Sequence, residues 1–167
     1  MNKLVLGTVQ FGCQHGINSA GRPDKQMVAD ILSEARKGGI MTLDTSAAYG
    51  NAEEVLGSLP ITNEFQIVSK YPKCDITVRE TIDASLVQLG CSKLYGYLLH
   101  HCSVYTENKA VWNEFIQLKE EGKVSKIGFS LYEPAELNLI LSEGIPFDLI
   151  QIPFNIFDRQ FAPYFEQ

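Results

Sequence analysis

Six polar side chains fall in, at the end of, or shortly after short apolar runs of the sequence. They are Asp44, Tyr49, Lys70, His100, Ser130 and Gln151. In parallel α/β folds the carboxyl ends of the strands form the functional face, so charged residues that end successive buried strands converge on one pocket. Because a buried Asp or Lys is costly unless it is paired, Asp44 and Lys70 are expected to lie together. The sequence therefore predicts a proton-donor site at the strand ends.

Each of these residues, taken alone, also has an ordinary structural explanation. Asp44 alone is typical of a loop or helix cap, and Tyr49 of a half-buried packing residue. Lys70 alone is typical of a solvated loop, and His100 of a hydrogen-bonded core histidine. Their occurrence at consecutive strand ends favours one shared site over these separate explanations.

The elements that must position these side chains are strands alternating with amphipathic helices. The apolar runs are Leu4–Leu6, Ile40–Leu43, Phe65–Val68, Leu94–Leu99, Val124–Phe129 and Phe147–Ile152. Most are continuous, which is typical of strands covered on both faces. This order of strands and helices, joined by right-handed crossovers, predicts a parallel sheet. A doubly wound sheet and a closed barrel both satisfy the pattern.

Capping residues mark where the helices begin. Asp24 is a predicted N-cap, Asn51 with Glu54 and Thr77 with Glu80 resemble capping boxes, and Pro134 suits a first helical turn. Another helix is expected from about Asn108 to Glu121.

Charge and composition exclude several functional classes. The chain has 167 residues and a net charge of −6, which argues against partners that require a basic surface, namely nucleic acids and anionic membranes. No apolar run has the length of a membrane span, and the short apolar start does not resemble a secretory signal, so a cytoplasmic location is expected. The four cysteines form no CxxC pair, and consecutive residues His100, His101 and Cys102 on an extended segment point to opposite faces. No metal site is expected.

The ordered motifs resemble the aldo-keto reductase family. Asp44 through Gly50 resembles its D-x4-Y-G signature, and Val68-Ser69-Lys70 its strand-three lysine. Tyr97-Leu98-Leu99-His100 is similar to its strand-four histidine segment, which favours His100 over the runner-up His101. The segment from Gly122 to Ser130, Gln151 in Gln-Ile-Pro-Phe-Asn, and Gly7, Thr8 and Gly12 also fit.

This resemblance implies NADPH-dependent reduction of an aldehyde or ketone on a TIM-type (β/α)8 barrel. Tyr49 is implied as the general acid, with Lys70 lowering its pKa and Asp44 holding Lys70 charged. His100 is implied to orient the carbonyl group. The implied cofactor contacts are Gly7, Thr8, Asp44, Ser130 and Gln151, of which Ser130 and Gln151 would bond the nicotinamide carboxamide. Leu131 departs from the family, which usually has Asn after the serine.

Residues 1–167 are expected to form a single domain, the N-terminal part of such a barrel with about six βα units. A full barrel has roughly 250 residues, and its last two strands bind much of the cofactor in this family, so the 167-residue chain alone is expected to be a truncated form with weak or no activity. The outer sides of Leu4–Leu6 and Phe147–Ile152 are therefore expected to be unpaired and to favour self-association. Four apolar residues are expected to have little to pack against: Ile156, Phe157, Phe161 and Phe165.

Two other functions remain open at this point. The chain could be a binding or regulatory module that keeps the barrel architecture without turnover. Lys70 could instead form a Schiff base, as in barrel aldolases, although an adjacent Asp44 would keep the lysine protonated.

Overall fold

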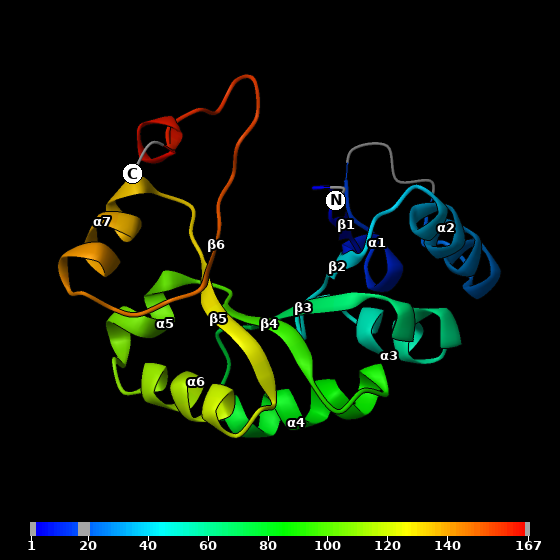
Figure 1. Ribbon diagram of the computed structural model, residues 1–167, viewed down its shortest axis with the longest axis horizontal. Helices are drawn as coiled ribbons and strands as arrows, with labels where there is room; N and C mark the ends of the chain where they lie inside the picture. Colours follow the sequence, from blue (N-terminus) through cyan, green and yellow to red (C-terminus); the bar gives the residue numbers. More distant parts are fainter. Residues whose placement is uncertain (1–2, 17–20, 166–167) are drawn as a thin grey trace.

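The computed structural model describes residues 3–16 and 21–165, in which six parallel strands form one curled sheet (Figure 1). The strands are β1 (Leu6–Gly7), β2 (Thr42–Asp44), β3 (Gln66–Tyr71), β4 (Leu94–Leu99), β5 (Val124–Ser130) and β6 (Leu149–Gln151). Their order in the sheet follows the sequence, from β1 to β6. A doubly wound sheet reverses its order at a switch point, whereas a barrel does not. The predicted incomplete barrel is confirmed.

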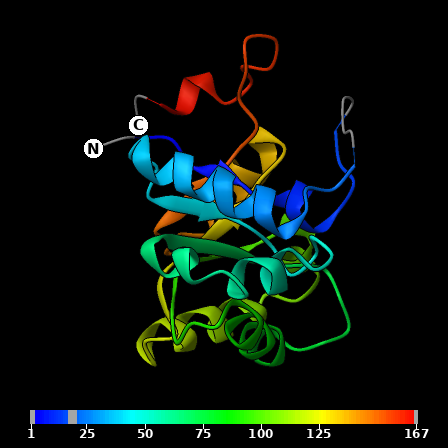
Figure 2. The ribbon, with the colours of Figure 1, turned by 90° about the vertical axis from the view of Figure 1, so that its right-hand side faces the viewer.

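Helices follow the strands and cover the convex side of the sheet, leaving its concave side open (Figures 1 and 2). They are α1 (Val9–Gly12), α2 (Lys25–Lys37), α3 (Ala52–Gly57), α4 (Val78–Leu89), α5 (Cys102–Glu107), α6 (Val111–Glu120) and α7 (Pro134–Ser142). Two 3₁₀ turns cover Pro60–Glu64 and Ala162–Tyr164. Within the described ranges, no helix is long and apolar enough to cross a membrane.

Most of the predicted helix starts are confirmed. Asp24 accepts a hydrogen bond from the Met27 amide, and Thr77 with Glu80 forms a complete capping box. The capping box predicted at Asn51 is wrong, because the Asn51 side chain accepts a hydrogen bond from Arg22 instead of capping α3.

The helix predicted from about Asn108 to Glu121 is confirmed as α6, which spans Val111–Glu120. The sequence pattern did not predict α5, a short helix that precedes it and ends before Asn108. Helix α5 has a single turn and a half and buries only Cys102 and Tyr105, so its apolar spacing is too short to show a helical period.

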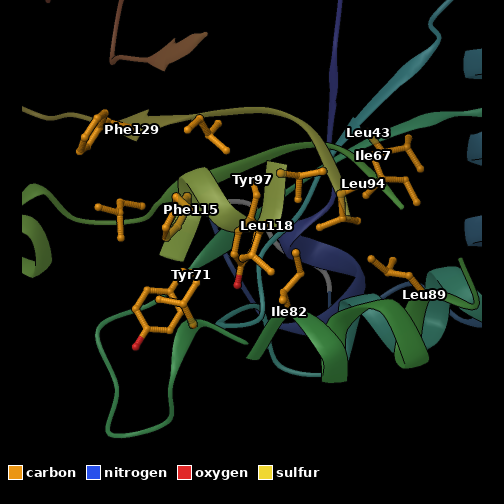
Figure 3. Close-up of a cluster of buried hydrophobic side chains, with 14 of the residues drawn as sticks. Leu43, Ile67, Tyr71, Ile82, Leu89, Leu94, Tyr97, Phe115, Leu118 and Phe129 are labelled. Carbon is orange, nitrogen blue, oxygen red and sulfur yellow. The ribbon is translucent and has the colours of Figure 1, made fainter. Parts of the chain in front are cut away.

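The main core lies between the sheet and the outer helices (Figure 3). Leu43, Ile67 and Leu94 from three adjacent strands are buried there beside Ile82 and Leu89 of α4. Aromatic rings fill the space under α6, where the Phe115 ring stacks on Tyr97 and on Trp112 at centroid distances of 5.1 and 5.3 Å. Side chains alternate along a strand, so the residues directly before and after these outward-facing core residues point into the barrel interior.

The two ends of the sheet are its outer strands, β1 and β6. Beyond β6, Ile156 and Phe157 are 82% and 93% exposed, and Phe165 is also exposed, as predicted. The same prediction was wrong for Phe161, which is fully buried, with its ring 6.2 Å from that of Tyr164. The segment folds back toward α7, because Gln160 donates to the Tyr132 carbonyl oxygen at 3.0 Å and the Tyr164 hydroxyl donates to Asn138 Oδ1 at 2.9 Å.

Candidate active site

Asp44 and Lys70 form a buried ion pair in the barrel interior. The Lys70 Nζ atom donates to Asp44 Oδ1 at 2.7 Å and to the Thr45 carbonyl oxygen at 2.9 Å. The two side chains are only 2% and 16% exposed. Burial lowers the pKa of Lys70, and the Asp44 carboxylate opposes that shift. The pairing expected from the cost of burying either charge alone is therefore present.

The Tyr49 hydroxyl lies next to this ion pair. Lys70 Nζ is 3.5 Å from the Tyr49 oxygen and 5.1 Å from the centre of its ring. Burial, followed by the Asp44 carboxylate, raises the pKa of Tyr49 to about 12. The expected lowering of this pKa is thus not found, because the Lys70 charge is balanced by Asp44 and is held mainly by closer oxygen atoms. Tyr49 is a protonated phenol at neutral pH, which is the form a general acid needs.

Two glycines hold the Tyr49 loop against α1. A Cβ atom on Gly12 would lie 1.7 Å from the Tyr49 carbonyl oxygen, so only glycine allows this approach. Gly50 has a φ of +59°, and a Cβ atom there would lie 2.5 Å from the Gly12 carbonyl oxygen. Helix α1 therefore sets the position of the Tyr49 backbone at the end of β2.

His100 lies on the other side of the Tyr49 ring. Its imidazole meets that ring edge-on at a centroid distance of 5.8 Å, and its Nδ1 atom is 3.1 Å from Ser46 Oγ. Burial, followed by the positive charge of Lys70, lowers the pKa of His100 to about 4, so the ring is neutral at pH 7. When Ser46 donates to Nδ1, the ring proton lies on Nε2, where it can be donated to a carbonyl oxygen. Sequence reasoning missed Ser46, although it lies within the same Asp-Thr-Ser segment.

Strand alternation predicts that His100 and His101 point to opposite sides. This prediction is wrong, because the two rings lie side by side. Strand β4 ends at Leu99, so the alternation rule no longer applies to the two histidines. Their rings stack at 4.9 Å, and His101 stacks in turn on Tyr132 at 5.6 Å. His101 is exposed, whereas His100 is buried and lines the cavity described next.

A cavity of about 260 Å³ joins these residues at the carboxyl ends of the strands. Its lining consists of Tyr49, Lys70, His100, Ser130, Leu131, Tyr132, Gln151, Ile152 and Pro153. Five of the six residues with which the sequence argument began thus share one cavity. The sixth, Asp44, contacts it through Lys70 and Gln151.

The residues expected to contact a cofactor are arranged around Asp44. The Gln151 amide donates to Asp44 Oδ1 at 3.1 Å, and the buried Ser130 lies beside it on β5. The Thr8 amide and hydroxyl both donate to the Asp44 carbonyl oxygen at 2.9 Å. Gly7 pairs with Asp44 in the sheet, and a Cβ atom there would meet nothing within 4 Å. Gly7 and Thr8 therefore lie beside Asp44, where β1 pairs with β2.

We expect His100 to make the free energy of unfolding depend on pH. Its pKa is about 4 in the folded chain and about 6.5 when unfolded, so between these values the unfolded chain binds a proton that the folded chain does not. Stability is then fully present above about pH 6.5 and is lost as the pH falls toward 4, by about 3 kcal/mol in total. Urea unfolding at a series of pH values from 4.5 to 7.5 measures this slope.

His100→Gln should reduce the pH dependence of the free energy of unfolding. His101→Gln, the same change at the exposed neighbour, is the control and should keep that dependence. An equal slope in wild type and His100→Gln would show that other groups cause the pH dependence.

Comparisons with known proteins identify the family of this chain. Residues 3–166 match the family model described as the aldo/keto reductase family. A curated relative, the NADH-specific methylglyoxal reductase of Escherichia coli, is 30% identical over an aligned length of 192 positions, and the match covers 95% of this chain and 57% of the relative. The chain thus spans little more than half the length of that relative.

Solved structures show the same fold. A Pseudomonas aeruginosa protein assigned to the aldo-keto reductases matches with a TM-score of 0.82 and 30% identity, covering 97% of this chain and 67% of its own. A Klebsiella pneumoniae aldo-keto reductase in complex with NADPH matches with a TM-score of 0.76 and 20% identity, covering 98% and 60%. With a family model that matches nearly the whole chain, and a strand-end site of the expected kind, this protein belongs to the aldo/keto reductase family.

Proposed function

We propose that this chain carries the proton-donor site of a reductase that converts an aldehyde or ketone to an alcohol with a nicotinamide dinucleotide. The observation that supports this most is the position of the Tyr49 hydroxyl. It lies 3.5 Å from a buried lysine ammonium and beside a neutral histidine, in one cavity. A protonated phenol in this setting can donate its proton to a substrate oxygen.

The chemistry divides between cofactor and protein. A bound reduced nicotinamide supplies the hydride that reaches the carbonyl carbon. As the carbonyl π bond breaks, its oxygen takes the proton of the Tyr49 hydroxyl, and a phenolate remains until solvent returns the proton. The Lys70 ammonium, 3.5 Å from the phenol oxygen, offsets part of the cost of this buried phenolate, and Asp44 keeps Lys70 in place. A positioned general acid of this kind contributes about 10²–10⁴-fold to the rate.

His100 is proposed to orient the carbonyl group. Its Nδ1 atom faces Ser46, so Nε2 remains available as a donor to the substrate oxygen. Because its pKa is about 4, the ring is an uncharged donor throughout the physiological pH range. It therefore fixes geometry without competing with Tyr49 as the acid.

The described residues suit a nicotinamide carboxamide, which needs both a donor and an acceptor. Ser130 offers a hydroxyl group in the cavity, and Gln151 offers the amide oxygen that its bond to Asp44 leaves available. The family resemblance favours NADPH, whereas the E. coli relative is named as NADH-specific. We propose NADPH as the cofactor and treat NADH as the alternative to be measured beside it.

The test is oxidation of NADPH and NADH at 340 nm, with a panel of carbonyl compounds that includes methylglyoxal, an aryl aldehyde, an aliphatic ketone and an aldose. Turnover with at least one compound, lost in Tyr49→Phe, supports the proposal. Absence of turnover with every compound and both cofactors, in a chain that carries the complete barrel, contradicts it.

A non-catalytic binding module is the second candidate, favoured by the outer strands β1 and β6 and by the exposed Ile156 and Phe157. Exposed strand edges and apolar patches promote association. This candidate predicts a dimer or larger oligomer in light scattering, with no saturable signal in a fluorescence titration with NADPH. A monomer that binds NADPH saturably would remove it.

A further inference from the structure

Glu53 is a buried acidic residue that the proposed chemistry does not use. It lies in the first turn of α3, is 2% exposed, and its Oε1 atom accepts a hydrogen bond of 2.6 Å from Ser69 Oγ. Burial raises its pKa, and the hydroxyls of Ser69 and Ser85 oppose that shift. Burying a carboxyl group costs free energy that an apolar side chain of similar size would not. Packing alone therefore does not explain this residue.

The Glu53–Ser69 bond joins the two segments that carry Tyr49 and Lys70. Ser69 directly precedes Lys70 on β3, and because strand side chains alternate, Ser69 faces the helices while Lys70 faces the barrel interior. Glu53 follows Tyr49 by four residues, and the amide of Ala52 donates to the Tyr49 carbonyl oxygen at 3.1 Å. A closed ring of contacts thus runs from Tyr49 through Glu53, Ser69 and Lys70 back to the Tyr49 hydroxyl.

We propose that Glu53 is a positioning residue whose hydrogen bond to Ser69 sets the separation between the Tyr49 hydroxyl and Lys70 Nζ. That separation is 3.5 Å, at the outer limit of a hydrogen bond, so a small shift of α3 relative to β3 breaks the contact. A displacement of about 1 Å in a catalytic group can reduce the rate by about 10²-fold. The kinetic part of this inference rests on the function proposed above, and the structural part does not.

Glu53 acts through this hydrogen bond rather than through its charge. Among charged groups, Asp44 has the largest effect on the pKa of Tyr49 and on that of Lys70. Glu53 is not among the groups that shift either pKa. Glu53→Gln therefore keeps the function, because its amide oxygen still accepts from Ser69. The buried Ser85 hydroxyl lies near enough to Glu53 to lower its pKa, yet it has no partner of hydrogen-bond geometry among the described residues, so it can accept from the new amide nitrogen.

The first measurement needs no turnover. The 167-residue chain is labelled with ¹³C-tyrosine, and the Tyr49 ring resonance is identified by its loss in Tyr49→Phe. Because the Tyr49 ring packs edge-on against His100, its chemical shift reports movement of the loop. The resonance should move in Ser69→Ala and Glu53→Ala, and should stay in place in Glu53→Gln and in Ile140→Val, a substitution in the fully buried core of α7.

The second measurement is steady-state kinetics on the same variants. Ser69→Ala should lower kcat about tenfold and Glu53→Ala about 10²-fold, with KM for the carbonyl substrate within about twofold and Glu53→Gln near wild type. If the complete barrel shows no turnover, the proposed function fails; in that case, and if only the 167-residue chain is inactive, the Tyr49 resonance alone decides this inference. An unmoved resonance in Ser69→Ala overturns it, as does a Glu53→Gln variant that behaves like Glu53→Ala. If Glu53→Ala does not fold, Ser69→Ala, which removes one oxygen atom, carries the test.

Discussion

Tyr49→Phe is expected to lower kcat for carbonyl reduction by about 10²–10⁴-fold, the usual contribution of a general acid. The substitution removes the hydroxyl that faces Lys70 and keeps the ring that packs against His100. KM for the substrate and Kd for the cofactor should stay within about twofold, because the expected cofactor residues are grouped around Asp44 and do not contact the phenol oxygen. Single-turnover mixing with excess protein measures the chemical step directly.

Tyr95→Phe is the matched control, since Tyr95 lies near the start of β4, where it packs on Lys126. It should retain wild-type kcat. A Tyr49→Phe variant with more than about one tenth of wild-type kcat would remove Tyr49 from the role of acid.

Local rules predicted the strands and the side chains that end them, whereas the choice of a barrel over a doubly wound sheet came from the resemblance to the aldo-keto reductase family. Buried strands have continuous apolar runs, and the barrel order places their carboxyl ends on one rim. The cost of burying charge then requires Lys70 to find Asp44, and the structure has that pair at 2.7 Å. None of these steps needs a distance between residues that are remote in the sequence.

The errors arose where tertiary contacts override local rules. The two histidines stack because β4 ends at Leu99, an end point that the apolar pattern does not show. The pKa of Tyr49 rises because burial outweighs a lysine whose charge Asp44 already balances. Phe161 is buried because its segment folds back through hydrogen bonds that apolar spacing does not mark. The Glu53–Ser69 bond joins residues 16 apart in the sequence, and neither residue type signals it.

Separating the buried ion pair should affect stability more than removing it. Asp44→Asn leaves the Lys70 ammonium, 2% exposed, without its anionic partner, and breaking a buried pair in this way costs about 3–5 kcal/mol. Lys70→Met leaves Asp44 at 16% exposure with the Gln151 amide as a donor, so its cost should be smaller. Urea unfolding at pH 7 gives the free energy of each variant.

The double variant Asp44→Asn with Lys70→Met should then be more stable than Asp44→Asn alone, because no buried charge is left unpaired. In a double-mutant cycle this appears as a coupling energy of at least about 1 kcal/mol between the two positions. Activity should not return with stability, since the double variant has no ammonium to stabilise the Tyr49 phenolate. Additive effects of the two substitutions on the free energy of unfolding would show that Asp44 and Lys70 do not stabilise each other, despite the 2.7 Å contact. Restored turnover would show instead that the reaction does not use Lys70.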